Sequence, residues 1–179
     1  LLGAIAHGDA ERDWAVLASE ARRQAAAGAD MIDVNVGYRL PGVSEADLMR
    51  NAVQAVQHAC DTPISIDTRD IASMEAALQV IRGKPLLNST AADPASLAAV
   101  LGLAKRYGAA VVGLPLDGTG VPETAAARLP LIERIVDSAR AVGLPACDLV
   151  IDGPTLRAGM HGRPAMETLA TVGLARQRF

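Results

Sequence analysis

The chain has 179 residues, half of them hydrophobic, which suffices for one sizeable core and predicts a single domain over residues 1–179. Its formal net charge is −3, 2% of its residues are aromatic, and lysine and arginine form no long run. These features exclude a basic or base-stacking surface for nucleic acid. No stretch reaches the roughly 18 unbroken apolar residues of a membrane span, so no membrane interaction is expected.

The cysteines and histidines give no sign of a metal site. Cys60 and Cys147 stand alone, without the spacing of metal ligands, and His7, His58 and His161 are scattered along the chain. The first residues lack the charged leader of a signal peptide. Reduced thiols and the missing leader predict a cytoplasmic protein.

In the first part of the chain, helical and strand-like segments alternate. A helical pattern begins at Asp13 and ends at Gly28, and a strand is predicted over residues 31–36. Ser44 begins the next helix with a sequence like a capping box. A strand over residues 63–67 follows and ends on a carboxylate.

The alternation continues in the middle of the chain. A helix is predicted to end at Gly83, and a short strand follows over residues 86–88. Asp93 and Pro94 are a helix N-cap followed by proline at the first helical position. Gly108 ends that helix.

The last part repeats the same unit. A strand over residues 109–114 precedes a helix over residues 123–142, which Gly143 closes. A strand over residues 148–152 and a last helix that fades near Phe179 complete the pattern.

Strands joined by helical crossovers are parallel, so the fold class is α/β. An open doubly wound sheet usually carries a GxGxxG turn after its first strand, and no strand-to-helix turn here has one. The other architecture, a (β/α)8 TIM barrel, takes about 250 residues. We therefore expect an incomplete piece of such a barrel, with about five strands, lacking the first strand and the last two or three.

Polar residues stand at or near the ends of the predicted strands, where a barrel builds its site. A carboxylate accepts hydrogen bonds and an amide both donates and accepts. Together they suit a flat heterocycle with an amino group beside a ring N–H, as in guanine or a pterin. The residues concerned are Asp33, Asn35, Asp67, Asn88 and Asp152.

The loops beyond these strand ends carry the cations. Lysine and arginine are absent from the strand ends themselves, which argues against a phosphate at the centre of the pocket. Arg39 and Arg69 lie on adjoining loops, where they could meet an anionic tail of the ligand. The glycine-rich segment 118–120 lacks the lysine and spacing of a phosphate loop and is interpreted as a lip of the mouth.

Each strand-end residue also has a purely structural interpretation. Asp67 and Thr68 could cap the next helix, and the Asn-Ser-Thr sequence at Asn88 could be a turn. Asp152-Gly-Pro is a common turn sequence, and Asp33 could bond to neighbouring loop amides. Four strands ending this way by chance is harder to accept than any single case.

Five short motifs, in this order, resemble the pterin-binding barrels of the dihydropteroate synthase superfamily, most closely the methyltetrahydrofolate–corrinoid protein methyltransferases. The resemblance covers nearly the whole chain. The motifs are GADMIDVNVG at 28–37, ISIDT at 64–68, LNST at 87–90, GAAVVGL at 108–114 with TGVP at 119–122, and DLVID at 148–152.

The resemblance implies a homodimeric (β/α)8 barrel that binds 5-methyltetrahydrofolate. It implies transfer of the N5 methyl group to the cobalt of a cobalamin on a separate corrinoid or corrinoid/iron–sulfur protein, or the reverse. Asp67, Asn88 and Asp152 would be the catalytic residues and would hold the pterin, while Asp33 and Asn35 would line the floor.

The resemblance also implies a gap. In this family an asparagine on the seventh strand joins the hydrogen-bond network of N5, and that strand would lie beyond Phe179. The isolated chain is therefore predicted to be inactive or nearly so.

Two alternatives remain open. Dihydropteroate synthase shares the pterin pocket, but we would expect a Ser-Thr-Arg-Pro-Gly-like loop after its second strand, where this chain reads GYRLPGV at 37–43. The other is a non-catalytic module that binds a pterin or docks a corrinoid protein.

Overall fold

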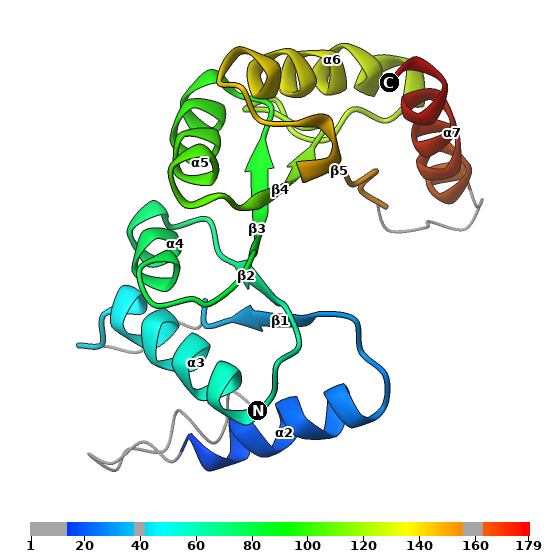
Figure 1. Ribbon diagram of the computed structural model, residues 1–179. Coiled ribbons are helices and arrows are strands. Elements are labelled where there is room, and N and C mark those ends of the chain that lie inside the picture. The colour runs from blue at the N-terminus through cyan, green and yellow to red at the C-terminus, as the bar shows by residue number, and fades with distance from the viewer. Residues whose placement is uncertain (1–13, 38–41, 156–162) are drawn as a thin grey trace. The chain divides into compact units, whose positions relative to one another are not determined.

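A computed structural model describes residues 14–37, 42–155 and 163–179 of the chain (Figure 1). The predicted helix start at Asp13 lies outside the described residues. So do Arg39, His7 and His161, on which further predictions fall.

The chain divides into two compact units, within residues 1–88 and 89–179, and strand β3 runs through the boundary. The first unit contains α2 (Ala15–Ala26), β1 (Ile32–Asn35), α3 (Glu45–Ala59), β2 (Ile64–Asp67), α4 (Ile71–Leu78) and the start of β3 (Leu86–Ala91). The second contains α5 (Pro94–Tyr107), β4 (Ala110–Leu114), α6 (Ala125–Ala141), the 3-10 helix η1 (Ala146–Asp148), β5 (Leu149–Ile151) and α7 (Arg163–Arg178).

The strands are parallel and follow the order of the chain in the sheet, which confirms the predicted α/β class. In the first unit, Asn35 of β1 pairs with Asp67 of β2, which in turn pairs with Asn88 of β3. In the second unit, β4 pairs with β5, and Gly113 faces Ile151. A crossover helix separates each strand from the next, as parallel pairing requires.

The starts of α3 and α5 and the end of α5 lie where the sequence predicts them. The Ser44 side chain accepts the backbone N–H of Asp47 at 3.3 Å, and Asp93 accepts that of Ser96 at 2.9 Å. Gly108 ends α5 in the left-handed region, with φ of 70°, a conformation that costs glycine least.

Two boundaries differ from the prediction by three residues or more. Helix α4 ends at Leu78 rather than near Gly83, because the Gln57 side chain binds the backbone beyond it. Its amide donates to the Val80 carbonyl at 2.8 Å and accepts the Arg82 N–H at 3.0 Å. Strand β3 continues to Ala91, three residues past the predicted end, and its Thr90 is fully buried.

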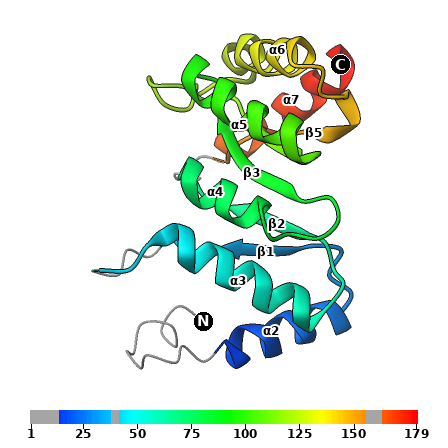
Figure 2. The ribbon, with the colours of Figure 1, turned by 60° about the vertical axis from the view of Figure 1, so that its left-hand side comes forward.

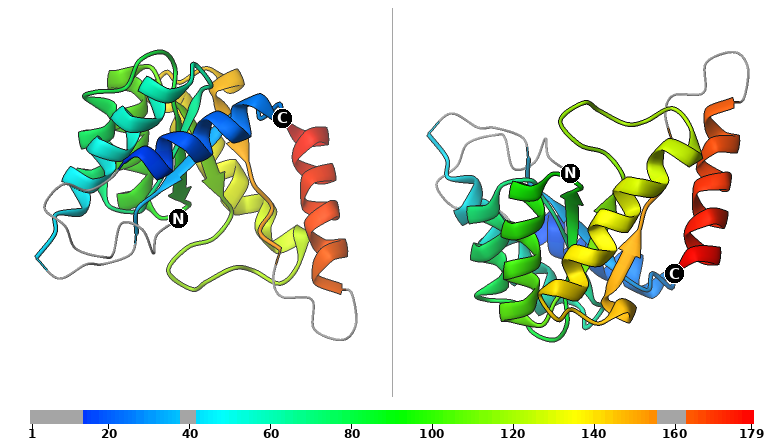
Figure 3. Two further views of the ribbon diagram at one scale, coloured as in Figure 1. Left: turned by 90° about the horizontal axis from the view of Figure 1, so that it is seen from below. Right: turned by 90° about the horizontal axis from the view of Figure 1, so that it is seen from above.

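Each unit has its own core between strands and helices. Side chains without exposed surface include Met49, Val53 and Met74 in the first unit, and Val111 and Ile132 in the second. Helices α2 and α3 lie side by side next to β1 (Figure 2), and α6 packs along α7 (Figure 3). In the part of the chain that the structure describes, no helix is both long and apolar enough to cross a membrane.

Candidate functional site

Three polar side chains stand in one row across β1, β2 and β3. Asn35, Asp67 and Asn88 are partners in the strand register, so they project from the same face of the sheet. The Asn35 amide Nδ2 donates to Asp67 Oδ2 at 2.6 Å. Asn88 Nδ2 lies 3.5 Å from Asp33 Oδ1, at the long limit of a hydrogen bond. The structure thus brings together four of the five predicted site residues.

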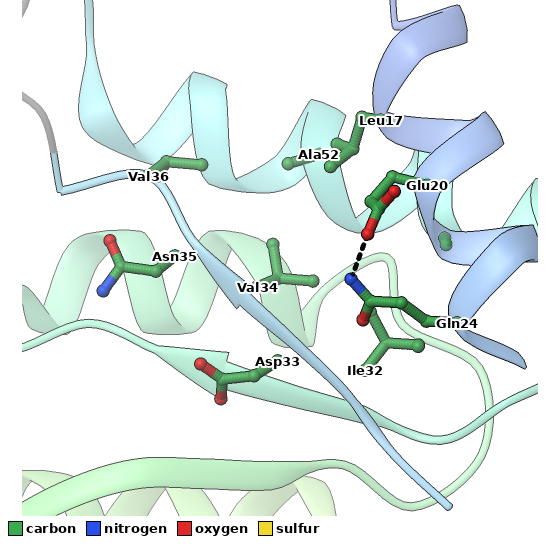
Figure 4. Close-up of a pocket in the computed structure, with 10 residues that line it drawn as sticks. Leu17, Glu20, Gln24, Ile32, Asp33, Val34, Asn35, Val36 and Ala52 are labelled. Atoms are coloured by element: carbon green, nitrogen blue, oxygen red, sulfur yellow. Dashed lines mark hydrogen bonds between the residues drawn. The ribbon is translucent and has the colours of Figure 1, made fainter. Parts of the chain in front are cut away.

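Strand alternation explains why β1 contributes two of them. Ile32 and Val34 are buried, whereas Asp33 and Asn35 are exposed. Figure 4 shows this division: Val34 points toward the helices, and Asp33 and Asn35 lie on the other side of the strand. A period of two therefore separates the core face from the polar face.

Asp67 is free of the capping role that its sequence allowed. The N-cap of α4 is Asp70, whose Oδ2 accepts the Ser73 N–H at 2.8 Å and the Ser73 hydroxyl at 2.6 Å. Thr68 donates its hydroxyl to Glu45 Oε1 at 2.8 Å, which ties the end of β2 to the first turn of α3. The capping interpretation of Asp67 is therefore wrong, whereas Thr68 Oγ1 accepts the N–H of the N-cap residue Asp70 at 3.1 Å and so supports the start of α4.

Two further structural interpretations fail as well. Asn88 lies inside β3, not in a turn, and its carbonyl accepts the Thr68 N–H at 3.0 Å. The described partner of Asp33 is the Asn88 side chain, 55 residues away, rather than a neighbouring loop amide. Both residues thus face other strands.

Asp152 belongs to the second unit. It follows β5, its residue is exposed, and its N–H donates to the Gly113 carbonyl on β4 at 3.1 Å. Asp152 therefore stands one residue past a strand end, as predicted. Its convergence with Asp67 on one ligand stays a prediction.

The loop after β4 holds a carboxylate that the sequence analysis did not select. Asp117 Oδ1 accepts the Thr119 N–H at 3.0 Å and the Thr119 hydroxyl at 2.7 Å. These bonds, with Arg134 at 3.8 Å, lower the pKa of Asp117 below its ordinary value of 3.8. An Asp-Gly-Thr sequence is typical of such a turn and was the available signal.

A second group that the sequence analysis missed ties this loop to α7. Arg128 is completely buried on α6, where Nε donates to the Pro122 carbonyl at 2.8 Å and Nη1 to Thr171 Oγ1 at 3.3 Å. Glu167 of α7 accepts the Ala125 N–H at 2.7 Å. The two contacts with α7 span more than 40 residues, so no local pattern could indicate them.

A cavity of about 220 Å³ lies along β1 and α2 (Figure 4). In it Gln24 donates to Glu20 at 2.7 Å, and the bonds from Arg23 and then Gln24 lower the pKa of Glu20 to about 2. Its lining residues are Leu17, Glu20, Ala21, Gln24, Ile32, Asp33, Val34, Asn35, Val36 and Ala52. Among the described residues, no group of three histidine, cysteine or acidic side chains could hold a metal ion.

Comparison with known proteins defines the class. Residues 5–173 match the family described as pterin binding enzyme, and the chain belongs to that family. A curated relative, the methylcorrinoid:tetrahydrofolate methyltransferase of Eubacterium limosum, is 28% identical over 144 residues. The match covers 79% of this chain and 52% of that protein, so the chain spans about half of the relative's length.

Solved structures of the same fold are dihydropteroate synthases. The enzyme from Vibrio fischeri ES114 is 22% identical with a TM-score of 0.68, covering 94% of this chain and 66% of the other. The Yersinia pestis DHPS, solved with a pterine–sulfa conjugate, is 16% identical with a TM-score of 0.69, covering 92% and 64%. These likenesses confirm the predicted fold, part of a (β/α)8 barrel.

Proposed function

We propose that this chain binds 5-methyltetrahydrofolate and takes part in moving its N5 methyl group to the cobalt of a corrinoid protein, or back. The observation that carries the proposal is the row of Asn35, Asp67 and Asn88 across the three neighbouring strands β1, β2 and β3. Membership of the pterin-binding family supports the ligand, and the Eubacterium limosum relative supports the reaction.

In this proposal, Asp67, Asn88 and Asp152 hold the pterin ring. A carboxylate can accept from the 2-amino group and the neighbouring ring N–H together, and the Asn88 amide supplies one donor and one acceptor to the ring. Asp33 and Asn35 line the floor beneath it. Asp152 completes the set from the second unit.

The charges at the strand ends suit the chemistry of the leaving group. When the methyl group departs, the bonding pair stays on N5, which would become a strongly basic anion unless N5 is protonated. Carboxylates at Asp67 and Asp152 favour the protonated, positively charged pterin, an electrostatic contribution of about a few kcal/mol. The corrinoid, carried by a partner protein, supplies the cobalt that accepts the methyl group.

The proposed setting is a cytoplasmic homodimer that meets a corrinoid or corrinoid/iron–sulfur protein. The name of the Eubacterium limosum relative, which includes both a methylcorrinoid and tetrahydrofolate, supports that partner. The segments that this relative has in addition would supply the rest of the barrel.

Dihydropteroate synthase is the second candidate, because its solved structures share the fold. The sequence GYRLPGV at 37–43 speaks against it, since it departs from the Ser-Thr-Arg-Pro-Gly-like loop expected there. The methyltransferase and the synthase reactions both involve a pterin ring, but their substrates differ. A substrate test therefore separates them.

The experiment measures binding and transfer together. Calorimetry with 5-methyltetrahydrofolate should give saturable binding to the chain, while methyl transfer to cob(I)alamin should be slow or absent. Completing the barrel with the remaining segments of the Eubacterium limosum relative should restore transfer.

Three outcomes oppose the proposal or part of it. Binding without transfer in the completed barrel would favour a non-catalytic module. Condensation of a dihydropterin pyrophosphate with p-aminobenzoate would favour the synthase. Full methyl transfer by the chain alone would refute the expectation that its site is incomplete.

A further inference from the structure

The side-chain amide of Asn35 is held at both ends. Its Oδ1 accepts the backbone N–H of Gly37 at 2.9 Å, and its Nδ2 donates to Asp67 Oδ2 at 2.6 Å. An amide has one accepting end and one donating end. Because the Gly37 N–H can only donate, it takes the oxygen and leaves the NH₂ group toward Asp67.

Glycine at position 37 makes this arrangement possible. A Cβ added there would lie 3.2 Å from Asn35 Oδ1, closer than an ordinary van der Waals contact. A side chain there would therefore require the amide to shift by a few tenths of an ångström.

The neighbouring asparagine is held less firmly. Asn88 Nδ2 lies 3.5 Å from Asp33 Oδ1, whereas Asn35 and Asp67 are 2.6 Å apart. A charge-assisted hydrogen bond of normal length is about 2.7–2.9 Å; the Asn35 contact is slightly shorter than this range, whereas the Asn88 contact is much longer. The two asparagines of the row therefore differ in what they can do.

We propose that Asn35 is a positioning residue that acts through Asp67. A carboxylate offers about four acceptor sites, and the Asn35 amide uses one of them. The bond fixes the rotation of the carboxylate, so that its remaining acceptor sites face the amino group and ring N–H of the pterin. This inference rests on the proposed function: Asn35 lines the floor of the site, and its effect on binding passes through the Asp67 carboxylate.

The test is a double-mutant cycle on binding of 5-methyltetrahydrofolate, measured by calorimetry. Asn35→Ala should weaken binding about 10-fold in the native background, the worth of one charge-assisted hydrogen bond. In the Asp67→Ala background the same change should alter binding less than about twofold, because the effect requires the carboxylate. An equal loss in both backgrounds would overturn the proposal.

A second variant tests the proposal independently in case Asn35→Ala does not fold. Gly37→Ala keeps both partners and only displaces the amide, so it should weaken binding about threefold, again only when Asp67 is present. Asn51→Ala, on α3 away from the row, is the matched control and should change nothing. Equal thermal stability of the variants by circular dichroism accompanies the measurement.

A ligand-free readout separates this proposal from the proposed function. In ¹⁵N-labelled protein the side-chain NH₂ resonances of Asn35, identified by their loss in Asn35→Ala, should move when Asp67 is changed to Ala. They should stay in place in the Asn51→Ala control. Unmoved resonances would refute the positioning role even if the ligand binds, whereas moved resonances without binding would refute only the function.

Discussion

The strand ends of the two units hold their polar groups in different ways. In the first unit, Asn35 reaches Asp67 across 32 residues of sequence, and Asn88 reaches Asp33 across 55. In the second unit, Asp117 takes its hydrogen bonds from Thr119, two residues along its own loop. A carboxylate that accepts its hydrogen bonds from residues of the same turn serves to stabilise that turn.

This difference identifies which polar strand ends can serve a ligand. Asp117 stabilises a turn, and its loop is further tied down by the buried Arg128 through the Pro122 carbonyl. The row in the first unit joins neighbouring strands and presents its acceptors on one face. Carboxylates with partners on other strands are therefore the better candidates for recognition.

The largest effect should come from Asp67. Asp67→Ala should weaken binding of 5-methyltetrahydrofolate by at least about 100-fold, since it removes a charged acceptor of two hydrogen bonds worth about 1.5–3 kcal/mol each. Calorimetry measures the loss, and Asn51→Ala serves as the control. Unchanged affinity in Asp67→Ala would mean that the first unit does not contribute to the binding site.

Replacing Asn88 tests how a further negative charge beside Asp33 affects ligand binding. Asn88→Ala should weaken binding about 10-fold through the loss of a donor and an acceptor to the ring. Asn88→Asp should be worse, because it places a second carboxylate toward Asp33, whose Oδ1 is 3.5 Å from the present amide. An aspartate variant that binds better than the alanine variant would contradict this account.

How much of the structure can be predicted from the sequence depends on how far apart along the chain the interacting residues lie. Alternation along β1 was sufficient to place Asp33 and Asn35 on the polar face, and the caps at Ser44 and Asp93 are local signals. The truncation of α4 depends on Gln57, more than 20 residues earlier, and no pattern within the helix announces it. Tertiary side-chain contacts of this kind override local propensity.

The same limit applies to the site. The sequence suffices to select Asp67, which ends a buried strand, and Asn88, which stands where the sequence predicts the end of the next one although β3 continues past it. It does not distinguish a cap from a ligand-binding residue at Asp67, since Asp70 stands three residues later with the same chemistry. Which of the two caps the helix is decided by backbone geometry.

In the second unit a small residue supports the position of Asp152. A Cβ at Gly113 would lie 2.8 Å from Ile135 Cγ2 on α6, so Gly113→Ala should destabilise the fold by about 1–3 kcal/mol. Denaturant unfolding measures this loss. Gly102→Ala is the matched control, because nothing lies within 4 Å of its added Cβ inside α5, and it should stabilise by about 0.5–1 kcal/mol.

The result at Gly113 bears on the site because its carbonyl accepts the Asp152 N–H. A shift of β4 should therefore weaken ligand binding as well as stability, whereas the first unit should keep its row intact. If Gly113→Ala is as stable as the native protein, the close packing of β4 against α6 is wrong.

The smallest effect concerns the turn at Asp117. Because its pKa is lowered in the folded protein, its contribution to stability is present above pH 3.8 and is lost as the pH falls through the lowered value. Asp117→Asn should be slightly less stable than the native protein at pH 7, and the two melting temperatures should converge below pH 3.8. Ligand affinity at pH 7 should not change.

Two results would contradict the comparison drawn here. A melting-temperature difference that persists at low pH would mean that the charge of Asp117 is not what stabilises the turn. A large loss of ligand affinity in Asp117→Asn would place this carboxylate in the site and remove the distinction between the two kinds of strand end.

A crystal structure of the protein with bound 5-methyltetrahydrofolate tests the central claim most directly. The account predicts that one pterin ring lies within hydrogen-bond distance of the Asp67 and Asp152 carboxylates and of the Asn88 amide. A ring bound elsewhere, or an Asp152 carboxylate turned away from a ring that Asp67 holds, would contradict it.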